Sequence, residues 1–402
     1  MSRAERRLPA VVVAGALLAG ACQIVAGIDG REVTAHDAGL GADASSPPAA
    51  AADGAADAGP SCRIGEERCG ATCVDVRTSP DHCGECGHSC LGAECRNGEC
   101  VPEPWIPGAL GSVEPGSVWV AGDELLYRPL PDDPNRVPNP SSPLLGKNRS
   151  SGAVRTILEV GRYVAMVPAG GSTFVLLDHA PGARVRKVDV QTGAASTLYQ
   201  QATTEPSFRG AVVDGSDVYW TTRNDVRHVK LDGSGYEVVY TPPAGKNVAH
   251  GIATTATSLY FGMGESSDGE LRAIGRAPGS TPRAVDFGAG GAAYVTVRQD
   301  TVLWTSGAQL REVPLPAEAP ATPRAIGTAD ARLAVERDGM LWIVDPVYGV
   351  AKPHQSRVVR YDPSTHRARV VVSGLAPMSQ IAVDERYLYL PLYDEGVWRV
   401  AR

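Results

Sequence analysis

The pattern that organises this chain is a pair of short apolar runs separated by a polar turn, repeated along residues 118–402. The three clearest copies span Ala211–Trp220, Leu333–Trp342 and Ile381–Leu390. Two runs of four to six apolar residues around a turn rich in Asp and Gly predict two antiparallel strands. Weaker copies end at Tyr127, Val175, Phe261 and Trp304, so the pattern occurs seven times.

The spacing of the copies indicates a repeat architecture. Corresponding positions in the second runs recur about every 44 residues, which is typical of propellers and related arrays. The positions are Leu126, Phe174, Tyr219, Tyr260, Leu303, Leu341 and Tyr389. A third apolar run follows each pair, such as Val185–Val188 or Val226–Val229, and a Gly-containing turn leads to a fourth. Each repeat is therefore predicted to form one four-stranded antiparallel sheet.

The second strand of each repeat predicts how the sheets pack. Neighbouring residues of a strand point to opposite faces of the sheet, and here both are apolar, as in Tyr219 and Trp220. The seven positions above are expected on one face and the residues after them on the other. A sheet with one face in water would alternate apolar and polar residues, so both faces are expected to be buried. This predicts an all-β, seven-bladed β-propeller, with six or eight blades as alternatives and separate β-sandwiches as the competing fold.

The two ends of the repeat region predict how the ring closes. The seventh copy stops after its third strand, Val397–Val400, and lacks a fourth. The segment Val101–Val113 precedes the first copy and has no partner, and its three prolines suit an edge strand. We therefore expect this segment to supply the outer strand of the last blade.

The repeats resemble the bacterial β-propeller repeats that carry a Val-Asp-x-x-x-Leu-Tyr-Trp core, over about 285 residues. The resemblance implies a fold for residues 101–402. It implies no activity, because propellers host many functions.

The first 22 residues have the features of a secretory signal. Arg3, Arg6 and Arg7 precede an apolar stretch that ends in Leu17-Leu-Ala-Gly-Ala-Cys22. This end resembles the lipobox of bacterial lipoproteins, although Ala19 stands where that family prefers Leu, and it implies lipidation of Cys22. An ordinary signal peptide is the alternative. In the lipoprotein family, Gln23 in place of Asp implies an outer-membrane lipoprotein, either periplasmic or exposed at the cell surface.

Residues 23–61 separate this signal from the rest of the chain. The stretch Asp29–Ser61 consists mainly of Ala, Gly, Pro and Asp and contains no aromatic residue. Such a composition cannot bury enough apolar surface to fold, so the segment is expected to be a disordered tether.

Residues 62–100 form a cysteine-rich module. Its eight cysteines are Cys62, Cys69, Cys73, Cys83, Cys86, Cys90, Cys95 and Cys100. An even number in a secreted chain with few apolar residues predicts four disulfides, with the connectivity left open. Zinc is the alternative, since Cys83-Gly-Glu-Cys86 has metal-ligand spacing and His82 and His88 lie near it.

The spacing of these cysteines also resembles the cysteine-rich repeat of stigma-specific proteins, which occurs in bacterial surface lipoproteins. The stretch Asp81-His-Cys-Gly-Glu-Cys-Gly-His-Ser-Cys90 carries much of the likeness. The resemblance implies an extracellular module and no reaction.

Composition and motifs narrow the function classes. The net charge of −7, without a basic patch interleaved with aromatics, argues against a nucleic-acid partner. The sequence contains no Gly-x-Ser-x-Gly, His-Glu-x-x-His or phosphate-binding glycine loop. No catalytic residue, metal or cofactor is therefore predicted. The alternative is a lactonase-like hydrolase or lyase with groups along the ring axis, for which His250 beside Asn247 is the best candidate.

Two recurring polar positions receive structural interpretations. Asp214, Glu336 and Asp384 follow first-strand valines and are expected to cap turns. An arginine recurs in the third strand, where its stem should cover apolar surface and its head should reach solvent. These arginines are Arg186, Arg227, Arg272 and Arg311.

Two insertions between second and third strands are candidate binding loops, Pro131–Pro143 and Asp345–Arg357. Long loops on a rigid scaffold commonly carry binding. The candidate ligand residues are Tyr348, Lys352, His354 and Arg357. The sequence thus favours a non-enzymatic, surface-tethered binding or scaffolding lipoprotein that recognises protein or glycan through a face of the propeller.

Overall fold

The computed structural model describes most of the chain from Cys62 onward. The described residues are 62–107, 118–129, 142–160, 164–178, 182–202, 208–264, 269–277, 279–287, 294–298, 300–306, 309–315, 324–326, 333–345, 356–365, 367–375, 381–392 and 395–402. All of them belong to one unit of the chain, Gly59–Arg402. Cys22 and the predicted tether lie outside them. Every regular element in the described part is a β-strand, so no described segment forms a helix that could cross a membrane.

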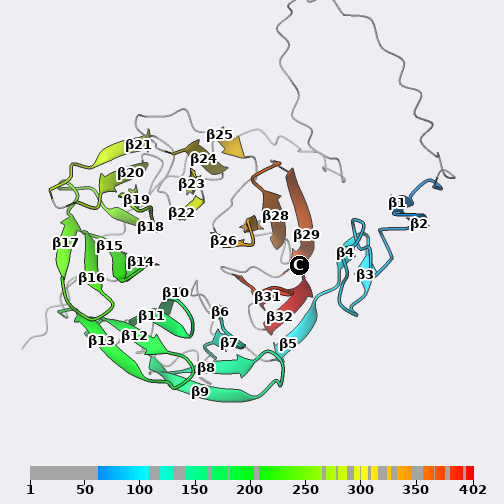
Figure 1. Cartoon of the computed structure of the whole chain (residues 1–402), viewed down its shortest axis with the longest axis horizontal. Helices are drawn as coiled ribbons and strands as arrows, with labels where there is room; N and C mark the ends of the chain where they lie inside the picture. The colour runs from blue at the N-terminus through cyan, green and yellow to red at the C-terminus, as the bar shows by residue number, and fades with distance from the viewer. Residues whose placement is uncertain are drawn as a thin grey trace, which may run out of the picture. The chain divides into compact units, whose positions relative to one another are not determined.

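Seven four-stranded antiparallel sheets surround a common centre, which confirms the predicted seven-bladed propeller (Figure 1). Blade 1 comprises β6 (Val118–Ala121), β7 (Glu124–Tyr127), β8 (Ser142–Asn148) and β9 (Val154–Val160). Blade 2 comprises β10 (Val164–Pro168), β11 (Thr173–Asp178), β12 (Arg184–Asp189) and β13 (Ala195–Gln200). Blade 3 comprises β14 (Phe208–Asp214), β15 (Asp217–Thr222), β16 (Val226–Lys230) and β17 (Glu237–Tyr240). Blade 4 comprises β18 (Val248–Thr254), β19 (Ser258–Met263), β20 (Glu270–Gly275) and β21 (Arg283–Phe287).

The remaining blades follow the same order. Blade 5 comprises β22 (Val295–Arg298), β23 (Thr301–Ser306), β24 (Gln309–Pro314) and β25 (Arg324–Ile326). Blade 6 comprises β26 (Leu333–Arg337), β27 (Met340–Asp345), β28 (Ser356–Asp362) and β29 (Arg367–Leu375). Blade 7 comprises β30 (Ala382–Val383), β31 (Tyr387–Leu392), β32 (Gly396–Ala401) and, from the other end of the chain, β5 (Glu103–Pro107).

The hydrophobic core is divided among the junctions between neighbouring blades. Each of the seven junctions holds one cluster of buried apolar side chains drawn from both blades. At the junction of blades 2 and 3, for example, Val175 and Leu177 pack with Val218 and Trp220. Each blade therefore buries both of its faces, as the paired apolar columns of the second strand predict.

The assignment of residues to the two faces needs one correction. Phe174 of blade 2 packs toward blade 1 and Leu341 of blade 6 packs toward blade 5, whereas Tyr219 packs toward the following blade 4. Their neighbours Val175 and Trp342 are the true equivalents of Tyr219. Successive strand residues alternate between faces, so the sequence alignment was one residue out of phase in these two blades.

The ring closes with a strand from the N-terminal side, as predicted. β5 pairs antiparallel with β32, with Ile106 opposite Val397 and Glu103 opposite Arg399. Within the expected Val101–Val113 segment, residues 103–107 form this strand and residues 108–113 lie outside the described part. Ile106 is buried in the cluster that joins blades 7 and 1. The two ends of the propeller are thus held by strand pairing and by apolar packing.

Lys147 and Arg399 hold the Trp105 side of this strand. The Lys147 ammonium group lies 4.3 Å from the centre of the Trp105 ring, and the Arg399 guanidinium lies 3.9 Å from it. The Lys147 ammonium also donates a hydrogen bond to the Trp105 carbonyl oxygen. Since Lys147 belongs to blade 1 and Arg399 to blade 7, β5 is tied to both of its neighbours.

The cysteine-rich module has two small hairpins, β1 (Glu67–Cys69) with β2 (Thr72–Val74) and β3 (Cys95–Arg96) with β4 (Glu99–Cys100). All eight cysteines form disulfides, as expected for this segment. The pairs are Cys62–Cys73, Cys69–Cys86, Cys83–Cys95 and Cys90–Cys100. Cys83 and Cys86 therefore belong to different disulfides and do not act together as a metal-ligand pair.

Candidate functional site

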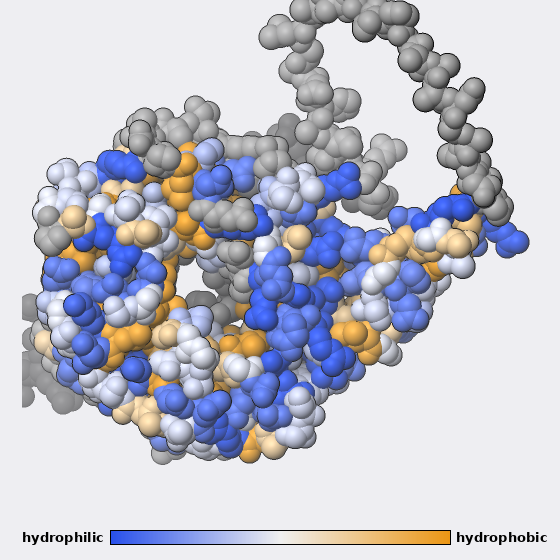
Figure 2. All heavy atoms as spheres, in the orientation of Figure 1, coloured by the Kyte–Doolittle hydropathy of each residue, from blue (hydrophilic) through white to orange (hydrophobic). Residues whose placement is uncertain are grey.

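The strand order gives the propeller two faces with different connections. The turns between first and second strands and between third and fourth strands share one face, which we call the turn face. The connections between second and third strands and between blades share the other, which we call the loop face. In the view of Figure 2 the centre of the ring is hollow, and hydrophobic residues line part of its wall.

The candidate ligand residues belong to the loop face by connectivity. They fall in or next to the connection between β27 and β28, and Tyr348, Lys352 and His354 lie outside the described residues. Arg357 lies near the start of β28, where it pairs in register with Asp345 at the end of β27. The Pro131–Pro143 insertion joins β7 to β8 and so reaches the same face.

The described residues also form an open depression on the turn face, where blades 3 and 4 meet. Its volume is about 580 Å³. It is lined by Asp214, Gly215, Ser216, Asp217, Thr254, Thr255, Ala256 and Arg276. Sequence analysis missed this depression because Arg276 follows the third strand of blade 4, about 60 residues after the carboxylates that it meets.

Arg276 organises the walls of this depression. Its guanidinium donates hydrogen bonds to Asp214, to Asp217 over 3.0 Å and to the Tyr219 hydroxyl over 3.1 Å. The guanidinium also lies 5.3 Å from the centre of the Tyr219 ring. Burial raises the pKa of Tyr219 and outweighs the opposing influence of Arg276, so the phenol stays protonated at neutral pH. The site therefore offers carboxylates and hydroxyls that are already held in place by an arginine.

The same arrangement recurs at two other junctions on the turn face. Arg149 of blade 1 bonds to Asp384 of blade 7, and Arg402 of blade 7 bonds to Asp338 of blade 6. Arg149, Arg276 and Arg402 all follow a third strand, and the backbone N–H of each donates to the first turn of its own blade. The equivalent residues of blades 2, 3 and 5 are Val190, Leu231 and Leu315, which make the same backbone bond. Three junctions thus carry a charged link, and three carry an apolar residue at this position.

Asp384 combines the predicted turn-capping role with this link. One carboxylate oxygen accepts hydrogen bonds from the backbone N–H groups of Arg386 and Tyr387, each over 2.7 Å. The other oxygen accepts from Arg149 and from the Tyr389 hydroxyl. Burial alone would raise the pKa of Asp384, but these hydrogen bonds and the Arg149 charge outweigh burial and lower the pKa.

The recurring third-strand arginines require a second correction. Their heads do not reach solvent but form buried or half-buried links between blades. Arg227 donates to Asp225 of its own blade and to the Tyr199 hydroxyl of blade 2, each over 2.8 Å. Arg272 repeats this pattern with Glu270 and the Tyr240 hydroxyl of blade 3. An arginine next to a partner carboxylate gains more from ion pairing than from hydration, which explains the difference.

Arg186 and Arg311 make related links. Arg186 donates to the fully buried carboxylate of Asp178 and to the Glu159 carbonyl oxygen of blade 1. Arg311 donates over 2.8 Å to Asp286, which stands in the outer strand of blade 4. All four arginines therefore hold a blade to the one before it, in the sector from blade 1 to blade 5.

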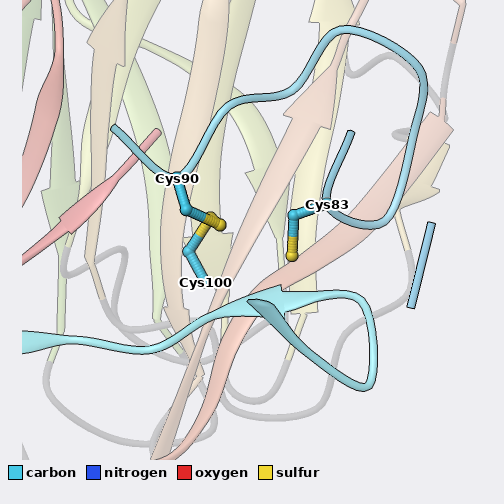
Figure 3. A group of neighbouring side chains, drawn as sticks. All are labelled: Cys83, Cys90 and Cys100. Carbon is cyan, nitrogen blue, oxygen red and sulfur yellow. A yellow bond between two sulfur atoms is a disulfide. The ribbon is translucent and has the colours of Figure 1, made fainter. Parts of the chain in front are cut away.

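Metal ligation and the ring axis are constrained by what the described residues contain. The metal-type group found among them consists of Cys83, Cys90 and Cys100, whose sulfurs lie within 4.8 Å of one another (Figure 3). All three are committed to disulfides, so none supplies the thiolate that zinc needs. His250 lies on β18, the innermost strand of blade 4, and its side chain lies outside the described part.

Comparisons with known proteins support the fold. Three solved structures are similar to this chain. A Mycobacterium tuberculosis puromycin-hydrolyzing peptidase is 13% identical with a TM-score of 0.53, over 74% of this chain and 54% of the peptidase chain. A chain of a mitotic checkpoint complex is 13% identical with a TM-score of 0.52, over 75% of this chain and 92% of that chain. The WD40 repeats of RRP9 are 10% identical with a TM-score of 0.51, over 74% and 99%.

These likenesses concern the propeller fold alone. At such identities nothing about activity or partners carries over, and the match spans only about half of the peptidase chain. No family model and no curated protein sequence matches this chain.

Proposed function

We propose that this chain is a lipid-anchored binding or scaffolding protein outside the cytoplasm, whose propeller recognises a protein or a glycan. The observation that carries the proposal is the position of the cysteine-rich module. It contacts β29, the outermost strand of blade 6, and continues directly into β5, the outermost strand of blade 7. A tether that enters through this module reaches the propeller at its rim and leaves both faces free for partners.

The compartment assigned in this proposal is supported by chemistry. Four disulfides within 39 residues suit an oxidising environment outside the cytoplasm. The lipobox-like stretch that ends at Cys22 supplies the anchor, and an outer-membrane location follows from Gln23 under the same resemblance. A lipid anchor and a rim attachment together give a protein that displays a rigid ring at a membrane surface.

The proposed recognition surface is the loop face. Both insertions reach it, and the candidate ligand residues Tyr348, Lys352, His354 and Arg357 supply aromatic and cationic groups. Aromatic and arginine side chains are enriched at recognition sites, because they bury large areas and donate several hydrogen bonds. The propeller behind them acts as a scaffold and supplies no reaction.

The anchor is tested by replacing Cys22 with serine in the full chain. We expect the wild type to enter the detergent phase in a phase-separation experiment and Cys22→Ser to remain in the aqueous phase. Partition of the variant into detergent would overturn the lipid anchor.

Recognition is tested with the purified chain on arrays of glycans and of surface proteins. We expect binding that is lost in a variant with Tyr348, Lys352, His354 and Arg357 all replaced by alanine. The matched control replaces exposed Ser196 and Thr197 on β13 and should bind like the wild type. Hydrolysis of a lactone panel that stops on chelation of metal would instead support the enzymatic alternative and contradict the proposal.

A further inference from the structure

The cysteine-rich module is attached to blade 6 by a specific polar surface. Glu85 forms an ion pair of 2.6 Å with Arg369 and a hydrogen bond of 3.1 Å with Arg360. The Arg369 guanidinium also donates to the Cys83 carbonyl oxygen over 2.8 Å. The carboxylate of Glu99 accepts from both the backbone N–H and the hydroxyl of Ser373. The module thereby satisfies polar groups along β29, which is otherwise the outer strand of its sheet.

Two of the four disulfides are part of the propeller core. Cys83, Cys90, Cys95 and Cys100 are between 0% and 5% exposed and belong to the cluster at the junction of blades 6 and 7. Val371, Val372 and Leu375 of β29 lie in the same cluster. By contrast, Cys62 and Cys69 are partly exposed, and Cys73 and Cys86 are exposed. The module therefore has an inner pair of disulfides against the propeller and an outer pair away from it.

The same chain reaches blade 7 almost at once. Cys100 ends β4, and three residues later Glu103 begins β5, which pairs with β32. A folded unit docked on blade 6 is thus covalently continuous with a strand of blade 7. We propose that the module is a clasp, which holds blades 6 and 7 together and keeps the ring closed, and that its inner disulfides give the clasp its rigidity.

The clasp can be followed without interference from the module itself. All six tryptophans lie between Trp105 and Trp398, so tryptophan fluorescence reports the propeller alone. Blade 6 and blade 7 each contribute one of them, Trp342 and Trp398. A thermal melt followed by this signal measures whether changes inside the module destabilise the propeller.

The first experiment compares two disulfides that close loops of nearly equal length in the full chain. Cys90–Cys100 spans 10 residues and Cys62–Cys73 spans 11, so their effects on chain entropy are nearly equal. We expect Cys90→Ala with Cys100→Ala to lower the propeller midpoint by about 5–10 °C. Cys62→Ala with Cys73→Ala should leave that midpoint within about 2 °C.

The second experiment keeps every disulfide and every charge. A Cβ added at Gly84 would overlap the Arg369 guanidinium and the Gly98 carbonyl oxygen, whereas a Cβ at Gly87 would meet nothing. Both glycines have a positive φ, +74° and +80°, so alanine strains the backbone equally at the two sites. Gly84→Ala should therefore lower the propeller midpoint and speed amide exchange of Ser373, and Gly87→Ala should do neither.

The results separate the clasp from simple tethering. Lower midpoints for Gly84→Ala and for the inner-pair variant, with both controls unchanged, support the clasp. An unchanged midpoint for Gly84→Ala, or equal shifts for the inner and outer pairs, would overturn it. Neither result depends on a bound ligand, so the clasp stands or falls separately from the proposed recognition function.

Discussion

The guanidinium of Arg149 in blade 1 bonds to the carboxylate of Asp384 in blade 7, two residues separated by 235 positions in the chain. The pair spans the junction at which the ring closes. Asp384 is 1% exposed and Arg149 is 14% exposed, so the link is shielded from water. Charged links in such surroundings depend on both partners, because removal of one leaves the other buried and unpaired.

Replacement of Arg149 by glutamine should therefore destabilise the whole ring. We expect a loss of about 3–5 kcal/mol in the free energy of unfolding, measured by urea denaturation. Arg402→Gln is the matched control, since Arg402 makes the equivalent link to Asp338, which is 55% exposed. An exposed pair contributes only about 0–1 kcal/mol. Equal losses in the two variants would contradict the role assigned to Asp384.

Asp384 should also make the propeller sensitive to acid. Its pKa in the folded protein lies below the ordinary value of 3.8. A depressed pKa adds stability above pH ~4 that is lost as the pH falls through the folded pKa. We expect the wild-type melting temperature to fall steeply below pH ~4, and Asp384→Asn to be less stable at pH 6 but to show a shallower acid dependence.

A matched control exists for this pH experiment. Asp232 also has a lowered pKa, because the hydroxyl and the backbone N–H of Ser234 donate to it, but it is fully exposed. Asp232→Asn should retain the wild-type acid profile. If the acid slope of Asp384→Asn equals that of the wild type, other carboxylates govern the acid response.

Closure by β5 should be visible in a single core substitution. Ile106 is 7% exposed between blades 7 and 1, and Ile106→Ala should cost about 2–5 kcal/mol. Val154, on the outer strand of blade 1, is 53% exposed, and Val154→Ala should change the stability by less than about 0.5 kcal/mol. The measurement is a melt followed by tryptophan fluorescence. A neutral Ile106→Ala would mean that β5 contributes nothing to closure.

The link between Arg227 and Tyr199 should appear as a coupling energy between blades 3 and 2. A double-mutant cycle with Arg227→Met and Tyr199→Phe should give a coupling of about 0.5–3 kcal/mol by urea denaturation. The equivalent pair Arg272 and Tyr240 provides an internal repeat of the same measurement. A coupling near zero at both pairs would restore the view that these heads are solvated.

The sequence by itself determined the number of blades and the identity of the closing strand. The number follows from the 44-residue recurrence of apolar runs, and the strand follows from the count of strands in the last repeat. The eight cysteines likewise predicted a disulfide module. These features are local or periodic, so they can be detected without knowledge of which residues meet in space.

The tertiary structure decided the phase of two blades and the partners of the arginines. In blades 2 and 6 the residue equivalent to Tyr219 is the one after the marker chosen from the sequence. Val175 lies opposite Lys187 and Trp342 opposite Arg360, as Tyr219 lies opposite His228. Both faces of every blade are buried, so a one-residue shift exchanges one apolar residue for another and leaves no trace in the pattern.

Contacts across blade junctions were hidden for a related reason. Arg227 finds Tyr199 only because two sheets stack face to face, and Glu85 meets Arg369 only because the module docks on blade 6. The pairing of the cysteines was undetermined too, since eight cysteines allow 105 arrangements and the spacing selects none of them. Such pairings depend on the close approach of distant segments, which packing in three dimensions decides.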